Sequence, residues 1–306
     1  MLALLKNRNF ILLLAIGLGL GLPQASTWTE VLMLPALALA MTLATINVPN
    51  DYFRRIRAMI VPSITGLIMT YVILGGVILA VSAILISDQN LWIGFVLIAA
   101  VPPAVAVIPF TAILDGDVAY TLSGTVVAYL AALLLMPLTF WMFIGAGMAD
   151  PWKLLKIMFL LIILPLVLSR VILFFNFQNR IASVRGVLTD WSFFVVVYTM
   201  IGVNRDLIFS HPMKIVPIAG VVLCATFILG FFIEKLAALL RIEKKTMISL
   251  VLLGTLKNQG IAGGLAIALF EKEAALPSAI YSIIMILYIM WLDVRRGLSS
   301  GIGNKA

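Results

Sequence analysis

The stretch LLGTLKNQGIAGG, residues 252–264, is the part of the chain on which the reading of its fold depends. It lies inside an apolar run of residues 247–270, which is long enough to cross a lipid bilayer. Lys257 sits near the middle of that run, where an ionisable side chain is costly unless it faces a protein interior, a wet cavity or a partner. The flanking glycines would let the helix open, and an opened helix in a bilayer persists only where its backbone lines a cavity. In the alternative reading, the lysine reaches along its stem to the interface and the glycines serve close helix packing. The central position of Lys257 favours the cavity.

The composition identifies a helical membrane protein. The 306 residues are 63% hydrophobic and 11% charged, and several apolar stretches exceed the roughly 18 residues that a transmembrane helix needs. Residues 1–306 therefore form one membrane domain without a soluble module. The net charge of +8 does not indicate nucleic-acid binding, because the basic residues cluster at span ends. One cysteine and one histidine provide neither a disulfide nor a metal cluster, and no nucleophile–base pair or phosphate loop indicates an enzyme.

About ten apolar spans are expected. They cover residues 10–22, 32–48, 59–86, 91–114, 118–145, 154–175, 191–209, 215–233, 247–270 and 276–292. The first is short and could be a signal peptide, since Ala25 and Ser26 follow it. We retain it as a span because the chain then divides into two halves of five spans, residues 1–147 and 148–306.

The basic residues support an arrangement with both termini in the cytoplasm. The inside segments then hold Lys6, Arg8, Arg54, Arg55, Arg57, Arg180, Arg185, Lys235, Arg241, Lys244, Lys245, Arg295, Arg296 and Lys305. The outside segments hold only Lys153, Lys156, Lys214 and Lys272, with Arg205 just inside a span end. This asymmetry follows the positive-inside rule, and with an odd number of spans the basic residues would no longer lie mainly on one side. The short connections and basic cytoplasmic face suit a bacterial inner membrane.

The fourth span of each half is interrupted, by Pro102, Pro103 and Pro109 in the first half and by Gly254 and Gly260 around the lysine in the second. Five spans per half is an odd number, so the second half enters the membrane from the opposite side. Interrupted helices in corresponding positions of inverted repeats are typical of a transporter's binding site near the bilayer midplane.

Several motifs now show a family resemblance. They are VPPA at 101–104, TAILDGDVA at 111–119, MTL at 41–43, PNDYF at 49–53 and NQGIA at 258–262. Together they resemble the bile acid/sodium symporter family in layout over nearly the whole chain. The resemblance implies ten helices in a panel domain and a core domain, two crossed broken helices in the core, and a small organic anion as cargo.

The chain departs from that family at the residues that hold sodium. The resemblance places Leu253 at a Glu position, Lys257 and Thr70 at Gln positions, and the pair Val107 and Ile108 at a Ser-Asn pair. Sodium prefers several oxygen ligands with a carboxylate, as hard cations do. We therefore expect sodium coupling to be lost and Lys257 to replace the ion. Its ammonium would bond to carbonyls freed by the breaks and to Thr70 or Thr125.

The predicted substrate and coupling site comprises Lys257, Asn258, Gln259, Thr255, Thr70, Thr111, Thr121 and Thr125. A fixed charge would give a uniporter or exchanger, whereas a lysine that releases and regains a proton would give proton coupling. Either form favours an anionic cargo. The expected partners are this anion and the bilayer, with no nucleic acid, no cofactor and no metal, and the oligomeric state stays open. The alternatives are an auxin-efflux-type carrier and a non-transporting sensor or scaffold of the same fold.

Overall fold

The computed structural model describes residues 5, 7–46, 56–145, 151–210 and 212–303, and this part of the chain contains helices and no strand. The all-α prediction is therefore confirmed for these residues. Residues 49–53, together with Lys6, Arg54, Arg55 and Lys305, lie outside the described ranges.

The first half of the chain contains the following elements: α1 (Arg8–Gly21), η2 (Pro23–Ala25), α2 (Ser26–Thr45), α3 (Ile56–Leu67), η4 (Ile68–Leu74), α4 (Gly75–Leu85), α5 (Gln89–Ala100), α6 (Val107–Ile113) and α7 (Val118–Phe143). The second half contains α8 (Pro151–Met158), η5 (Phe159–Ile163), α9 (Leu164–Phe174), α10 (Gln178–Val203), α11 (Arg205–Ser210), α12 (Pro212–Leu223), η6 (Cys224–Ile228), α13 (Leu229–Leu239), α14 (Lys244–Leu253), α15 (Gln259–Leu269), η7 (Lys272–Ala275) and α16 (Leu276–Gly303). The elements η4, η5 and η6 are π-helical turns within longer helices.

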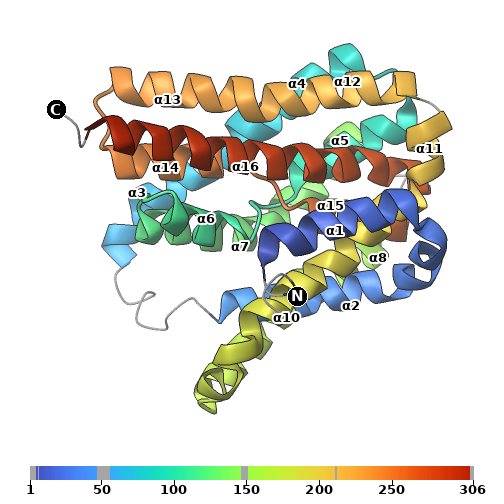
Figure 1. Ribbon diagram of the computed structural model, residues 1–306, viewed down its shortest axis with the longest axis horizontal. Helices are drawn as coiled ribbons and strands as arrows, with labels where there is room; N and C mark the ends of the chain where they lie inside the picture. The colour runs from blue at the N-terminus through green and yellow to red at the C-terminus, as the bar shows by residue number, and fades with distance from the viewer. Residues whose placement is uncertain (1–4, 6, 47–55, 146–150, 211, 304–306) are drawn as a thin grey trace.

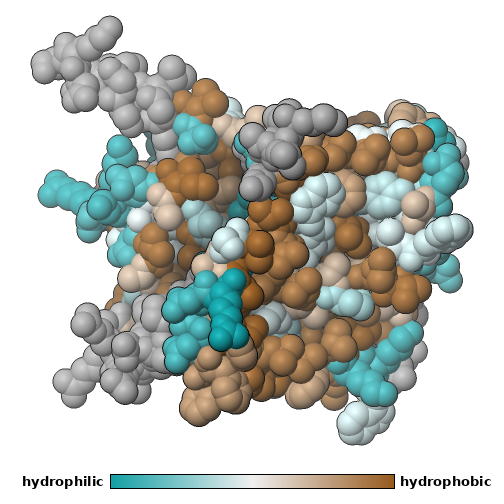
Figure 2. Space-filling model, turned by 60° about the horizontal axis from the view of Figure 1, so that its bottom comes forward, coloured by the Kyte–Doolittle hydropathy of each residue, from teal (hydrophilic) through white to brown (hydrophobic). Residues whose placement is uncertain are grey.

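Seven helical stretches of the described chain are long and apolar enough to cross a membrane. They are Pro23–Thr45, Met59–Leu85, Val118–Phe143, Trp152–Phe174, Gln178–Val203, Pro212–Leu239 and Lys272–Arg295. Three shorter apolar helices, Phe10–Gly21, Gln89–Ala100 and Gln259–Leu269, accompany them. Figure 1 shows most of these helices running side by side along one direction, and Figure 2 shows apolar side chains covering much of the surface between more hydrophilic ends. This is the surface of an integral membrane protein.

The helices form two groups. The first, which we call the panel group, comprises α1, α2, η5 with α9, and α10, which pack against one another. Figure 1 shows α1, α2 and α10 of this group. Within it, the hydroxyls of Thr29 and Thr199 lie 2.6 Å apart, and the Tyr198 hydroxyl donates to the carbonyl of Leu22 over 2.7 Å. The second, the core group, comprises α3 to α7 and α12 to α16, in which α3 packs on α7 and α5 packs on α4, α15 and α16.

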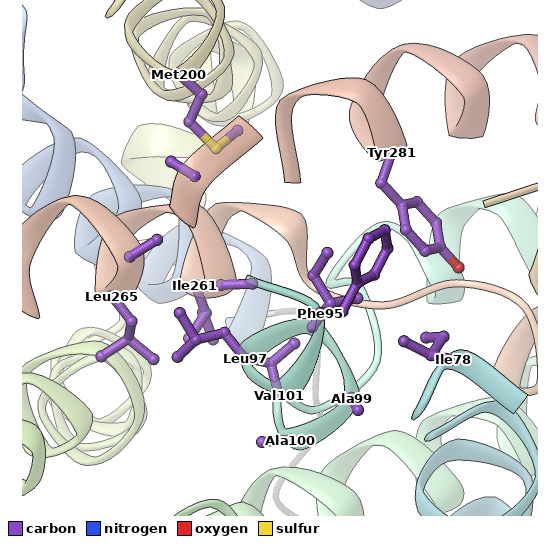
Figure 3. Close-up of a cluster of buried hydrophobic side chains, with 14 of the residues drawn as sticks. Ile78, Phe95, Leu97, Ala99, Ala100, Val101, Met200, Ile261, Leu265 and Tyr281 are labelled. Carbon is purple, nitrogen blue, oxygen red and sulfur yellow. The ribbon is translucent and has the colours of Figure 1, made fainter. Parts of the chain in front are cut away.

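The core group is built around α5, whose residues from Ile93 to Ala100 are buried. Figure 3 shows Phe95, Leu97 and Val101 among side chains of α15 and α16. Small residues allow the closest approaches: a Cβ atom on Gly66 of α3 would overlap the backbone of Gly124 on α7. Close backbone contact at small residues is a common way to pack helices in a bilayer, where the hydrophobic effect between helices is weak.

One expected element boundary is wrong. The apolar pattern predicts a span that starts at residue 191, but α10 begins at Gln178 and runs through the polar residues before it. Most of these residues are exposed or partly exposed, and apart from Gly186 the segment 178–190 contains no strong helix breaker. The helix therefore extends beyond the apolar segment rather than starting with it.

Candidate functional site

Two chain breaks meet in the centre of the core group. The first separates α5, which ends at Ala100, from α6, which begins at Val107, and the second separates α14 from α15 between Gly254 and Asn258. The breaks run antiparallel, with an isolated β-bridge between Pro103 and Lys257. The amide of Ala104 donates to the carbonyl of Leu256 over 3.2 Å, and the amide of Asn258 donates to the carbonyl of Pro102 over 3.0 Å.

Proline explains which carbonyls the first break leaves open. In a continued helix the carbonyl of Ala99 would accept from the amide of residue 103, but Pro103 has no N–H. The ammonium of Lys257 takes that place, at 2.7 Å from the oxygen of Ala99 and 2.8 Å from that of Val101. The hydroxyl of Tyr129 donates to the carbonyl of Pro103 over 2.9 Å. Each of these carbonyls thus has a donor from another part of the fold, as buried backbone groups require.

At the second break, side-chain hydroxyls donate to the backbone carbonyls that lack a helical partner. Thr70, in the π-helical turn η4, donates to the carbonyl of Leu253 over 3.2 Å. Tyr281 of α16 donates to the carbonyl of Thr255 over 2.9 Å. Both donors come from other helices, so the opened segment is held in place by its neighbours.

Asn258 connects the two breaks. Its carbonyl oxygen accepts from the amide of Ile261 over 3.1 Å and so caps α15. Its amide nitrogen donates to the Tyr129 hydroxyl over 2.8 Å, and that hydroxyl in turn donates to Pro103. One side chain therefore starts α15 and ties it to the end of α5.

Lys257 is completely buried. Besides its two carbonyl acceptors, its ammonium lies 4.6 Å from the centroid of the Tyr71 ring, a cation–π contact. In the described part of the chain no carboxylate pairs with it. The positive charge instead lies at the carboxyl end of α5, where the helix dipole favours a cation.

The other predicted site residues lie in three places. Four of them lie where the two breaks meet, a place that we call the crossing, and are at most 3% exposed: Asn258, Gln259, Thr255 and Thr70. Thr111 and Thr121 bond to each other over 3.0 Å between α6 and α7. Thr125 lines a separate cavity between α7 and the panel group, and its hydroxyl has no partner in the described chain.

Three sequence expectations are wrong. The ammonium of Lys257 has only carbonyl acceptors, so neither Thr70 nor Thr125 binds it. Pro109 does not interrupt a helix, because it lies in the first turn of α6, where no intrahelical N–H bond is required. Gly260 is likewise helical, as the second residue of α15.

Sequence reasoning also missed three tyrosines. Tyr71, Tyr129 and Tyr281 hold the crossing through a ring face and two hydroxyls. In the sequence they resemble other aromatic residues of apolar spans. Their one distinguishing signal is a phenolic hydroxyl within a span, which needs a hydrogen-bond partner when buried.

Two neighbouring cavities that share lining residues lie between the crossing and the end of the molecule where α1 begins. The inner one, of about 60 Å³, is lined by Lys257, Asn258 and Gln259 together with residues of α1, α10 and α16. The outer one, of about 370 Å³, continues past Phe110 toward Asp293. Both lie between the panel group and the core group, so a ligand in them would touch both.

The comparisons with known proteins extend this picture. No curated protein matches the chain. The model of the Sodium Bile acid symporter family matches residues 34–211, from α2 to the end of α11, which is more than half of the chain. Its members are transporters of organic anions rather than enzymes. On this match, the chain is an integral membrane protein that belongs to the Sodium Bile acid symporter family.

Proposed function

We propose that this protein is a secondary active transporter that moves a small organic anion by alternating access, independently of sodium, with Lys257 in place of the coupling ion. The observation that carries the proposal is the bonding of the Lys257 ammonium to the carbonyls of Ala99 and Val101 at the crossing. Family membership supports the organic anion as cargo.

We further propose ten membrane crossings in two inverted repeats. In this arrangement α1 is the first crossing, α5 with α6 the fourth, and α14 with α15 the ninth. Two correspondences support it. The third crossing of each half carries a π-helical turn, η4 in one and η6 in the other, and the fourth crossing of each half carries the break. The packing of α1 against α10 supports counting α1 as a crossing.

Sodium does not fit beside Lys257. The carbonyl oxygens of Ala99 and Val101 would be ligands for a metal ion, but the ammonium is bonded to both. A second cation at that place would meet the repulsion of a buried charge with no carboxylate paired to it in the described chain. The lysine would hold the crossed helices together as a bound ion does.

Two forms of coupling agree with this site. If Lys257 stays charged throughout the cycle, the protein is a uniporter or an exchanger. If the lysine releases its proton in one conformation and regains it in the other, transport is coupled to protons. We place both termini in the cytoplasm and the protein in a bacterial inner membrane, on the positive-inside asymmetry of the sequence.

Uptake of labelled organic acids into proteoliposomes tests the proposal. We expect uptake at a rate that is the same in sodium and in potassium buffers and that Lys257→Ala abolishes. A pH gradient that drives accumulation would select the proton-coupled form. A strict requirement for sodium would overturn the role given to Lys257, and the absence of uptake for every acid would favour a non-transporting protein of the same fold.

A further inference from the structure

Arg8 occupies an unusual position for a basic residue at the end of an apolar helix. The residue lines both the inner and the outer cavity. Only 25% of its side chain is exposed. A basic residue that serves only to orient a span extends into water or toward lipid headgroups, whereas this one faces the space between the panel and core groups.

The guanidinium is incompletely paired there. Its Nε atom lies 3.6 Å from a carboxylate oxygen of Asp190, too far for a hydrogen bond, and this buried Nε has no partner in the described chain. The guanidinium carbon lies 4.8 Å from the centroid of the Phe110 ring, on α6 of the core group. A buried Nε donor without a hydrogen bond is costly, and the exposed quarter of the side chain leaves Arg8 open to a further partner in the cavities.

A second unpartnered group faces the same inner cavity. The side-chain carbonyl oxygen of Gln259 has no hydrogen-bond partner in the described chain, and the residue is only 3% exposed. Arg8 belongs to the panel group and Gln259 to the core group. The Gln259 oxygen is an acceptor and does not bind a carboxylate, but a ligand between the two residues would contact both groups that alternating access moves relative to each other.

The cavity walls define the chemistry of that ligand. Arg8 and Lys257 are the charged residues that line the inner cavity, and both are positive. Asp190 pairs with Arg8 without lining the cavity, so one positive charge remains, while Asp293 is exposed and lines the outer cavity. The remaining walls are mostly apolar, and those of the inner cavity include Leu12, Phe193, Val196, Val197, Met285 and Ile286. These features match one carboxylate on an apolar body, because a guanidinium binds a carboxylate in bidentate fashion.

We propose that Arg8 is the residue that binds the carboxylate of the cargo, a small monocarboxylate with an apolar body, and that Asp190 holds the guanidinium in place between transport cycles. This inference rests on the proposed function. Beyond that function, it identifies Arg8, outside the crossing, as a residue that binds the cargo, and it specifies a cargo with a single negative charge.

The experiment measures uptake of benzoate and 1-naphthoate into proteoliposomes and the inhibition of that uptake by benzamide and 1-naphthamide, which lack the charge. In Arg8→Gln we expect KM for the acids to rise about ten- to a hundredfold, since a charge-assisted hydrogen-bond pair is lost. The preference for acid over amide should disappear with it. Arg8→Lys should lie between Arg8→Gln and the wild type, because it keeps the charge but not the planar fork.

The chain contains a matched control in Arg205. Arg205 begins α11, and its Nε donates to the carbonyl of Leu20 on α1 over 3.2 Å. Like Arg8, it pairs with an aspartate, Asp206, at 3.0 Å, and its guanidinium lies 5.0 Å from an aromatic ring, that of Phe209. It lines neither the inner nor the outer cavity. Arg205→Gln should therefore leave the KM for acids and the preference over amides unchanged.

The outcomes separate this inference from the proposed function. If the acids are transported and Arg8→Gln keeps the KM and the preference of the wild type, or if Arg205→Gln changes them equally, the role of Arg8 is wrong and the transporter stands. If the wild type transports neither of these acids but does transport other organic anions, the inference about the cargo is wrong and the transporter stands. If it transports no organic acid, both are wrong. Should Arg8→Gln fail to fold, Asp190→Asn provides a second test, because removal of the competing carboxylate should lower KM. An unchanged KM in both Asp190→Asn and Arg8→Lys would overturn the inference.

Discussion

Between α5 and α6 the helix stops at Pro102 and Pro103, which carry no N–H, whereas between α14 and α15 every residue from Gly254 to Asn258 carries one. The first break therefore exposes carbonyls because their donors are missing from the chain. The second break exposes carbonyls although donors are available, so other interactions must keep it open. Lys257 provides one of these interactions, because its ammonium bonds to the carbonyl of Ala99, whose helical donor would be at Pro103, and to the carbonyl of Val101 inside the break.

The two breaks thus depend on each other in unequal ways. The first break, at Pro102 and Pro103, would interrupt a helix in any surroundings. The second break, at Lys257, requires hydrogen-bond acceptors for the ammonium, and the carbonyls of the first break supply them. Tyr129 and Asn258 then join the two segments directly. These differences allow the substitutions to be ranked by their expected effect on stability. Removal of the Lys257 ammonium should have the largest effect, and removal of Lys214, which lies away from both breaks, the smallest.

Replacement of Lys257 by Met should have the largest effect. Met has a similar length but no donor, so the carbonyls of Ala99 and Val101 would remain buried without partners. We expect the free energy of unfolding to fall by about 1–3 kcal/mol, measured by thermal unfolding of the purified protein, and uptake to be lost. A Lys257→Met protein as stable as the wild type would show that the second break stays open without the ammonium.

Tyr129→Phe should have the next largest effect. The change removes the donor to the Pro103 carbonyl and the acceptor of the Asn258 amide while leaving the ring in place. We expect a loss of about 1–2 kcal/mol of stability and a lower rate of uptake. Tyr198→Phe is the control, because its hydroxyl bonds to Leu22 within the panel group, and it should lower stability without changing the KM of uptake. Equal effects of both changes on uptake would argue against a special role for the link between the breaks.

Pro103→Ala tests the dependence of one break on the other. Alanine restores an N–H at position 103, which could bond to the carbonyl of Ala99 in place of the missing ammonium. In the Lys257→Met background this change should recover about 0.5–1.5 kcal/mol of the lost stability, measured as the coupling energy of a double-mutant cycle. Pro109→Ala, in the first turn of α6, should recover none. Recovery by both would indicate a general effect of proline removal.

The sequence was sufficient to predict features that depend on local chemistry. A proline pair within an apolar span removes donors wherever the span lies, and a lysine at mid-span must find acceptors, so the interruptions at Pro102, Pro103 and Lys257 could be predicted. The tyrosines could not, because only the folded chain brings Tyr129 and Tyr281 to carbonyls from other helices. Arg8 was counted as a topology signal because its sequence position, before an apolar helix, is the same in either role.

The glycines show a second limit of sequence reasoning. The sequence predicts that the glycines around Lys257 let the helix open. In the structure, Gly254 has an ordinary negative φ of −92° and Gly263 lies inside α15. A Cβ atom on Gly254 would come within 2.6 Å of Ile233, and one on Gly263 would overlap the sulfur of Met200. These glycines permit close packing, the role that the alternative reading gave them.

Lys214→Met should have the smallest effect and completes the comparison of buried and exposed lysines. Lys214 lies 2.9 Å from Asp88 and 2.6 Å from Glu273, partly exposed, so it has the carboxylates that Lys257 lacks. Exposed ion pairs of this kind contribute about 0.2–1 kcal/mol, and we expect a loss in that range with no change in uptake.

The ion pairs of Lys214 also make the stability loss in Lys214→Met depend on pH. Partial burial acts to raise the pKa of Asp88, but hydrogen bonds from Lys214 and from the amides of Leu91 and Asn90 outweigh it and lower the pKa below its usual range. Asp88 therefore contributes stability that is present above the pKa of its unfolded state and is lost as the pH falls through the lower folded value. In thermal unfolding at a series of acidic pH values, the difference between the wild type and Lys214→Met should shrink over that window, while the difference between the wild type and Lys257→Met, which involves no carboxylate, should not follow it. A Lys214→Met difference that is independent of acid pH would show that the lysine stabilises the protein by packing rather than by charge.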